Sequence, residues 1–168
     1  MENKLPIILD IEASGFGRGS YPIEVGFVLP SKKRLNYLVK PEDNWTHWSS
    51  SAEHKHHIKR ELLFNMGFNV RQVADELNKT LAGELVYTDA WGHDLSWLGK
   101  LYDAAGCLPS FKLEPIRAIL TQAQIEIWHS VKDNLVELYK EPRHRASSDA
   151  AIIQLCYEFT QVETAQYF

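Results

Sequence analysis

The chain has 168 residues, of which 45% are hydrophobic and 24% are charged, a composition typical of a globular protein. Its formal net charge of −4 argues against a protein that coats nucleic acid non-specifically, because such proteins are basic. It does not exclude a nucleic-acid enzyme whose acidic site binds cations. No apolar run approaches the roughly 20 residues of a membrane-spanning helix, so no membrane contact is expected.

The two cysteines provide neither a disulfide framework nor a metal-type spacing, as expected of a protein from a reducing compartment. The first apolar run reaches acidic residues too early for a signal peptide. The length favours one folding unit. We therefore expect a single domain over residues 1–168, located in the cytoplasm.

Short apolar runs separated by turn residues predict three strands near the start of the chain. Residues 5–12 form the first run, residues 21–30 form the second with proline at both ends, and residues 34–41 form the third. Strands that follow one another so closely predict an antiparallel meander.

Helical periodicity dominates from residue 50 onward. Asn69 is expected to cap a helix, Gly67, Gly83 and Gly106 to end helices, and Ser147 or Ser148 to cap the last one. The expected helices cover residues 50–58, 60–67, 69–83, 93–106, 115–139 (as one or two helices) and 147–161, with extended stretches at 84–89 and 111–115. This order predicts an α/β fold with a mixed sheet flanked by helices.

Two carboxylates stand at the end of the first expected strand. Because side chains alternate along a strand, Asp10 and Glu12 share a face with Ile8, and their Cα atoms lie about 7 Å apart. Two like charges this close repel each other and resist burial. Either cationic side chains or bound divalent metal ions must neutralise the pair.

Two further acidic residues each begin the apolar stripe of an expected helix. Asp94 precedes Leu98, and Asp149 precedes Ile153, both at helical spacing. One such residue is compatible with a solvent-facing carboxylate at a helix N-terminus. Four carboxylates at the ends of elements whose apolar faces must meet favour a shared metal site, with the hard oxygen ligands that Mg²⁺ or Mn²⁺ prefers.

His144 lies five residues before Asp149. Within a helix, five residues would turn it roughly 140° away from Asp149, so we expect it on the loop that enters the last helix. A neutral imidazole beside a metal-bound water can act as a general base. An exposed loop histidine without a catalytic role is the alternative.

Together these residues resemble the DEDD exonuclease superfamily in its histidine-containing branch, DEDDh, which includes ribonuclease T, oligoribonuclease and the proofreading exonucleases of bacterial DNA polymerases. The first motif, "LDIEASG", contains Asp10 and Glu12. The third, "HRASSDA", contains His144 and Asp149 and matches the pattern His-x-Ala-x-x-Asp-Ala. The tyrosine branch of the superfamily would have tyrosine at position 145, where this chain has arginine. The resemblance extends over nearly the whole chain.

The second motif, "GHDLSWL", is similar to the family pattern in that Asp94 is followed by Trp97 and Leu98. The family's usual His-Asn-x-x-Phe lead into this aspartate is reduced to "WGH". Asp89 therefore remains an alternative to Asp94 as the second-motif ligand. Asp89 lacks the aromatic-leucine pair that follows Asp94.

The resemblance implies a ribonuclease H-like fold and removal of nucleoside 5′-monophosphates from the 3′ end of single-stranded RNA or DNA. Two Mg²⁺ or Mn²⁺ ions would clamp the attacking and leaving oxygens. His144 would take the proton of the attacking water. The residues expected to bind the metal ions and to support catalysis are Asp10, Glu12, Asp94 and Asp149.

The resemblance also implies substrate contacts and a homodimer. Phe16 would lie near the terminal base, and His57 with Ile58 resembles a helix start that borders the substrate groove. Ser14, where the family often has threonine after the first glutamate, is expected to bind substrate as well. The alternatives to an exonuclease are a catalytically silent module that binds nucleic acid or a partner, and a metal-binding structural domain.

Overall fold

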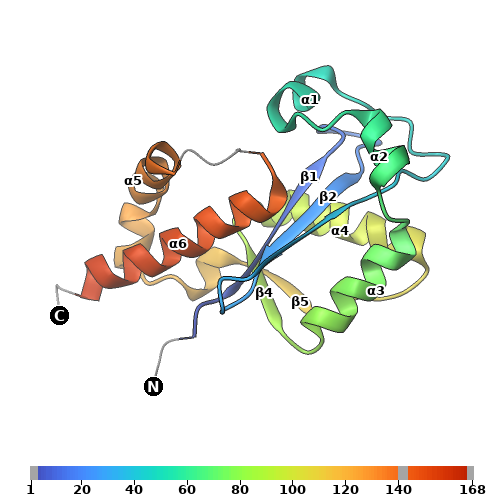
Figure 1. The fold of residues 1–168 in the computed structure, drawn as a ribbon. Coiled ribbons are helices and arrows are strands. Elements are labelled where there is room, and N and C mark those ends of the chain that lie inside the picture. Colours follow the sequence, from blue (N-terminus) through green and yellow to red (C-terminus); the bar gives the residue numbers. More distant parts are fainter. Residues whose placement is uncertain (1–3, 140–143, 166–168) are drawn as a thin grey trace.

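The computed structural model describes residues 4–139 and 144–165, and its centre is a five-stranded sheet (Figure 1). The strand order is β3-β2-β1-β4-β5. The first three strands pair antiparallel, and the last two run parallel to β1. This confirms the meander and the mixed sheet. The strands are β1 (Ile7–Ala13), β2 (Pro22–Val28), β3 (Arg34–Leu38), β4 (Leu85–Thr88) and β5 (Lys112–Pro115).

Helices cover both faces of the sheet (Figure 1). They are α1 (Ser50–His56), α2 (Arg60–Met66), α3 (Val70–Leu81), α4 (Trp91–Ala105), the 3-10 helix η1 (Ile116–Ile119), α5 (Gln122–Leu138) and α6 (Ala146–Ala165). The side chain of Asn69 caps α3 as expected. The expectation that Ser147 or Ser148 caps the last helix is wrong, because α6 begins at Ala146 and contains both serines.

The central strand β1 is buried on both faces, which explains its nearly continuous apolar sequence. Leu9 and Ile11 point into a core that includes residues of α3 and α4. Ile8 points to the opposite face, where it packs with Trp128 of α5 and Ile153 of α6. Strand alternation therefore directs Asp10 and Glu12 to the face that α5 and α6 cover.

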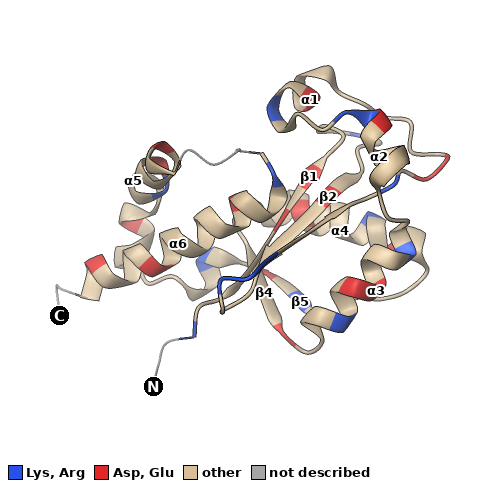
Figure 2. Ribbon diagram, in the orientation of Figure 1, with Lys and Arg blue, Asp and Glu red and all other residues tan. Residues whose placement is uncertain are grey.

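Acidic residues also lie within the sheet, on strands β1 and β2 (Figure 2). Most acidic positions lie on helices and loops, but β1 and β2 also carry acidic residues within the sheet. A charged residue inside a sheet resists burial unless a partner compensates it. Among the residues that the structure describes, no helix is long and apolar enough to cross a membrane.

Candidate active site

A cavity of about 280 Å³ lies beside the C-terminal half of β1, and residues from α1 and from the first turns of α4 and α6 also line it. All five residues that the sequence predicts for metal binding and catalysis lie on its wall. They come from three separate parts of the chain. They are Asp10, Glu12, Asp94, His144 and Asp149.

Negative charge accumulates where β1 borders the cavity. Burial, followed by the charges of Asp94 and Glu12, raises the pKa of Asp10 well above its usual value. Burial and the nearby Asp149 raise the pKa of Glu12 to about 8. The described protein groups therefore leave this cluster short of positive charge at neutral pH.

Asp94 lies in the first turn of α4 with 1% of its surface exposed. It accepts hydrogen bonds from the hydroxyl of Thr88, at the end of β4, and from the backbone N–H of Ile11. Burial outweighs these bonds and raises its pKa to about 7. Asp94 is thus held by hydrogen bonds to two neighbouring strands, β4 and β1.

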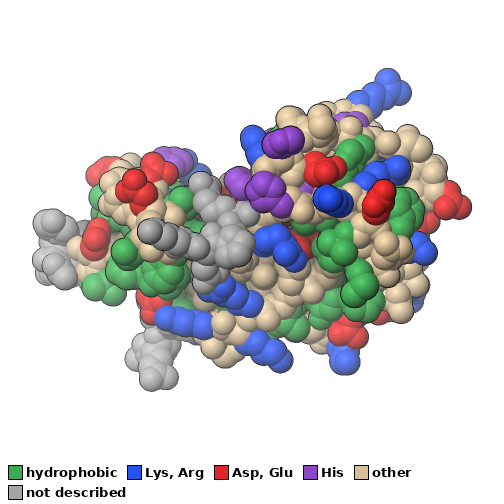
Figure 3. Space-filling model, turned by 45° about the horizontal axis from the view of Figure 1, so that its top comes forward, with side chains coloured by type: hydrophobic (Ala, Val, Ile, Leu, Met, Phe, Trp, Pro, Cys, Tyr) green, Lys and Arg blue, Asp and Glu red, His purple; other side chains and the backbone are tan. Residues whose placement is uncertain are grey.

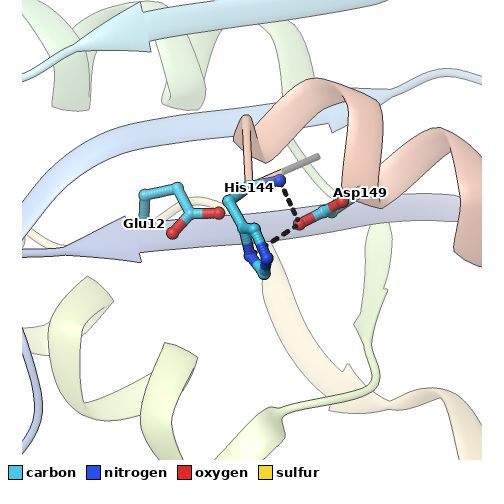
Figure 4. A group of neighbouring side chains, drawn as sticks. All are labelled: Glu12, His144 and Asp149. Atoms are coloured by element: carbon cyan, nitrogen blue, oxygen red, sulfur yellow. Dashed lines mark hydrogen bonds and ion pairs between the residues drawn. The ribbon is translucent and has the colours of Figure 1, made fainter. Parts of the chain in front are cut away.

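Asp149 and His144 approach Glu12 from the start of α6 (Figure 4). The backbone N–H of His144 donates to Oδ2 of Asp149 at 3.2 Å, and His144 Nδ1 lies 4.0 Å from the same oxygen. One potential ligand atom from each of the three side chains lies within 4.8 Å of the other two. His144 lies before the first residue of α6, as its spacing from Asp149 predicts. Its backbone is in the left-handed conformation, with φ of 60°.

Asp89, the alternative second-motif residue, does not line this cavity. It forms an ion pair with Lys132 of α5 and borders a smaller neighbouring pocket. Its charge still contributes to the raised pKa of Asp94. The structure therefore brings Asp94 to the cavity wall and gives Asp89 a cationic partner.

Of the three predicted substrate-binding residues, one lines the cavity and two do not. Phe16 lines the cavity with 66% of its surface exposed, and its ring centre lies 5.1 Å from that of His93. Ser14 is fully buried, and its hydroxyl bonds to His47 and accepts from a backbone N–H. His57 is exposed and lies off the wall, whereas its neighbour His56 lines it.

Basic side chains lie near the cavity on α1. Figure 3 shows histidines clustered with lysines or arginines on the upper part of the molecule. On α1, His54 and Lys55 are exposed, and Lys55 lines the cavity. Lys55 therefore places one positive charge at the cavity wall.

Glu24 is a buried carboxylate that the sequence did not single out. It lies on β2 opposite Glu12 of β1 and forms an ion pair with Arg145. Arg145 in turn lowers the pKa of Glu12, against the larger effects that raise it. The available signal was a glutamate inside the apolar run "YPIEVGFV", where a charge must have a partner.

The donor set of the cavity fits a hard divalent cation. Four carboxylates and the imidazole of His144 are among the groups that line the same space, and oxygen ligands are those that Mg²⁺ and Mn²⁺ prefer. Burial, and after it repulsion between the carboxylates, raises the pKa of Asp10 and Glu12, and a bound cation would offset both effects. A zinc site of the cysteine-rich structural type does not match these ligands.

Comparison of the sequence with protein-family models and with curated proteins finds no match. The fold, in contrast, is similar to that of exonuclease I. A zinc-bound complex of Escherichia coli exonuclease I with single-stranded DNA superposes with a TM-score of 0.68 at 12% identity, covering 95% of this chain and 40% of that chain. Another structure of exonuclease I gives 0.70 at 10% identity, with coverages of 96% and 42%.

A more distant exonuclease I, from Methylocaldum szegediense, gives a TM-score of 0.51 at 9% identity over 76% of this chain. The chain spans about two fifths of the length of the Escherichia coli exonuclease I chains that it matches. These structures confirm the ribonuclease H-like fold expected from the resemblance to DEDDh exonucleases. At such identities they establish the fold alone.

Proposed function

We propose that residues 1–168 form a single exonuclease domain that removes nucleoside 5′-monophosphates from the 3′ end of single-stranded nucleic acid in a metal-dependent reaction. One observation carries the proposal: four carboxylates and His144 converge on one cavity, although they come from distant parts of the sequence. A module that only binds has no need to bring four acidic side chains together. The similarity of the fold to exonuclease I supports the same reaction class.

Two Mg²⁺ or Mn²⁺ ions would be held by the carboxylates on the cavity wall. When bound, such ions polarise the phosphodiester and stabilise charge on the attacking and leaving oxygens. Asp10 is close enough to Asp94 and Glu12 for their charges to raise its pKa, in addition to burial, so its carboxylate would hold a metal ion together with theirs. Glu12 and Asp149 lie on the His144 side of the cavity.

His144 is the proposed general base. Its backbone is held by Asp149, while its ring stays at the edge of the cavity. In this position the imidazole would accept the proton of the attacking water and release it to solvent. The side chain is 37% exposed, so the proton has a path out.

The aromatic group at the cavity mouth is the proposed contact for the terminal base. Phe16 packs against His93 and Trp97 and leaves most of its ring accessible. Bases of single strands stack on such rings without sequence preference. Exonuclease I has been crystallised with single-stranded DNA, so DNA is the first substrate to test, beside RNA.

The test is an assay on short single-stranded DNA and RNA labelled at the 5′ end, with Mn²⁺ or with EDTA. We expect stepwise shortening from the 3′ end that EDTA abolishes. His144→Ala should lower kcat by about 10²- to 10⁴-fold, the usual contribution of a general base. His129→Ala, an exposed histidine outside the cavity, is the matched control.

Binding of the labelled strands without shortening, at high enzyme concentration and with both polymers, would contradict the proposal and favour a silent binding module. Stabilisation by Mg²⁺ with neither binding nor shortening would favour a structural metal site. Light scattering on the purified chain tests the homodimer that we propose from the resemblance.

A further inference from the structure

The carboxylate of Glu24 accepts hydrogen bonds from three other residues near the cavity. It is fully buried and accepts from Nε of Arg145 at 2.9 and 3.1 Å and from Nη2 at 2.6 Å. The backbone N–H of Ala146 donates to it at 2.8 Å, and Nδ2 of Asn36 at 2.6 Å. Two of these partners flank the start of α6, more than 120 residues along the chain.

Gly26 allows the same helix to approach β2 closely. It lies two residues after Glu24 and therefore on the same face of the strand. A Cβ at this position would lie 2.1 Å from the backbone nitrogen of Ser147. The next strand contributes Asn36, whose Oδ1 accepts from the Ser147 N–H at 3.2 Å. We call Glu24, Gly26 and Asn36 the α6 cradle.

The cradle supplies hydrogen-bond acceptors to the start of α6 from across the sheet. The first N–H groups of a helix have no partner within the helix. Here Glu24 and Asn36 accept from the N–H groups of Ala146 and Ser147 across the sheet. A negative charge at this end of a helix is also favourable.

The cradle is in register with the cavity ligands on the neighbouring strand. In the β1–β2 ladder, Glu24 pairs with Glu12 and Gly26 pairs with Asp10. His144 and Asp149 lie on either side of the residues that the cradle holds. Neither Glu24 nor Arg145 lines the cavity itself.

We propose that Glu24 and Arg145 are positioning residues: with Gly26 and Asn36, their ion pair fixes the start of α6 on β2 and thereby sets His144 and Asp149 against Glu12. The effect of Glu24 and Arg145 on the reaction rests on the proposed function. Their effect on the position of the start of α6 does not rest on it, and this effect can be measured without substrate. Outer residues that orient metal ligands typically contribute about 10- to 100-fold to affinity or activity.

Two substitutions break the ion pair in different ways. Glu24→Gln keeps the size of the side chain and an oxygen that can accept from Ala146, but it removes the charge that faces Arg145. Arg145→Ala removes the cation and leaves the Glu24 carboxylate with the N–H groups of Ala146 and Asn36. Arg145→Lys keeps a cation beside the buried carboxylate, so it remains testable even if one of the other two variants does not fold. Arg71→Ala is the matched control, because Arg71 forms a surface ion pair with Asp75 on α3, away from the cavity.

Hydrogen exchange of the metal-free proteins is the first measurement. We expect faster exchange in residues 144–150 of both variants, with other segments unchanged, and no such effect in Arg71→Ala. Calorimetric titration with Mn²⁺ alone should show an affinity about 10- to 100-fold lower in both variants. Unchanged exchange together with unchanged Mn²⁺ affinity would overturn the inference, whether or not the wild-type protein degrades nucleic acid.

Kinetics separate positioning from general stability. We expect Glu24→Gln and Arg145→Ala to lower kcat by about 10- to 100-fold with little change in KM. Guanidinium ion at concentrations well below those that unfold the protein should restore kcat in Arg145→Ala, and Arg145→Lys should retain more activity than Arg145→Ala. A purely structural role predicts a smaller folded fraction with unchanged kcat per folded molecule and no rescue.

Discussion

Replacing Gly26 by alanine is predicted to displace the first turn of α6. The new Cβ would lie 2.1 Å from the backbone nitrogen of Ser147 and 2.5 Å from the carbonyl carbon of Ala146, whereas ordinary contact begins at 3.4 Å. The Ser147 nitrogen would have to retreat by about 1.3 Å. The helix must make this movement, because β2 is held between β1 and β3 in the sheet.

The size of the effect follows from this displacement. A catalytic group misplaced by about 1 Å can cost about 10²-fold in rate. Overpacking a buried position typically costs roughly 1–3 kcal/mol of stability. We therefore expect Gly26→Ala to lower kcat by about 10²-fold and the free energy of unfolding by about 1–3 kcal/mol.

Single-turnover hydrolysis of a labelled oligonucleotide measures the first quantity, and denaturant unfolding of the metal-free protein measures the second. Gly99→Ala is the matched control, because a Cβ at position 99 of α4 would meet nothing within 4 Å beyond its chain neighbours and the backbone of its own helix. That substitution should keep full activity and stabilise the helix by up to about 1 kcal/mol. Wild-type kcat and stability in Gly26→Ala would refute the close approach of α6 to β2.

Three further outcomes are expected. Burial raises the pKa of Glu12 to about 8 and that of Asp94 to about 7, so the folded metal-free protein binds protons more tightly than the unfolded chain. The free energy of unfolding should therefore fall as pH rises from about 5 to 8. Saturating Mg²⁺ should remove most of this slope in thermal unfolding, and an unchanged slope would contradict the shared metal site. Asp94→Asn should abolish hydrolysis whereas Asp89→Asn should retain most of it, and the reverse order would make Asp89 the second-motif ligand. Phe16→Ala should raise KM for single strands by about 5- to 100-fold, from roughly 1–3 kcal/mol of lost stacking, with less effect on kcat. The remote, exposed Phe159→Ala should leave KM unchanged.

Local periodicity was sufficient to predict which acidic side chains meet. Alternation along β1 places Asp10 and Glu12 on one face, and helical spacing places Asp94 and Asp149 at the start of buried stripes. Both rules depend only on neighbouring residues, and the structure brings all four side chains to one cavity. The sequence favours Asp94 over Asp89 through the aromatic-leucine pair that follows Asp94. The fold adds what local rules could not give, which is that Asp89 has a cationic partner, Lys132, on α5.

The orientation of Ser14 could not be predicted from strand alternation, because the alternation ends just before this residue. Strict alternation would give Ser14 the orientation of Glu12. The β1–β2 register instead shifts between Glu12 and Ala13, and the strand ends at Ala13. Ser14 then turns into the interior, where it bonds to His47. Its predicted contact with substrate stays a prediction without support from its position.

The start of α6 was outside the reach of local rules for another reason. A helix cap is normally sought within the first turn, which is why the serines after Ala146 were the natural candidates. The groups that accept from the first N–H groups are Glu24 and Asn36, more than 100 residues earlier in the chain. Only the pairing of β2 and β3 brings them there.

The distance in sequence between Glu24 and the start of α6 has a consequence for the order in which the protein folds. Contacts between segments so far apart form late, because closing a long loop costs more conformational entropy than local pairing. The β1–β2 hairpin can assemble Asp10 and Glu12 early, but His144 and Asp149 join them only when the last helix docks. A chain whose last helix has not docked would therefore lack Asp149 and the proposed base, His144. The proposed activity would therefore require that α6 is already in place.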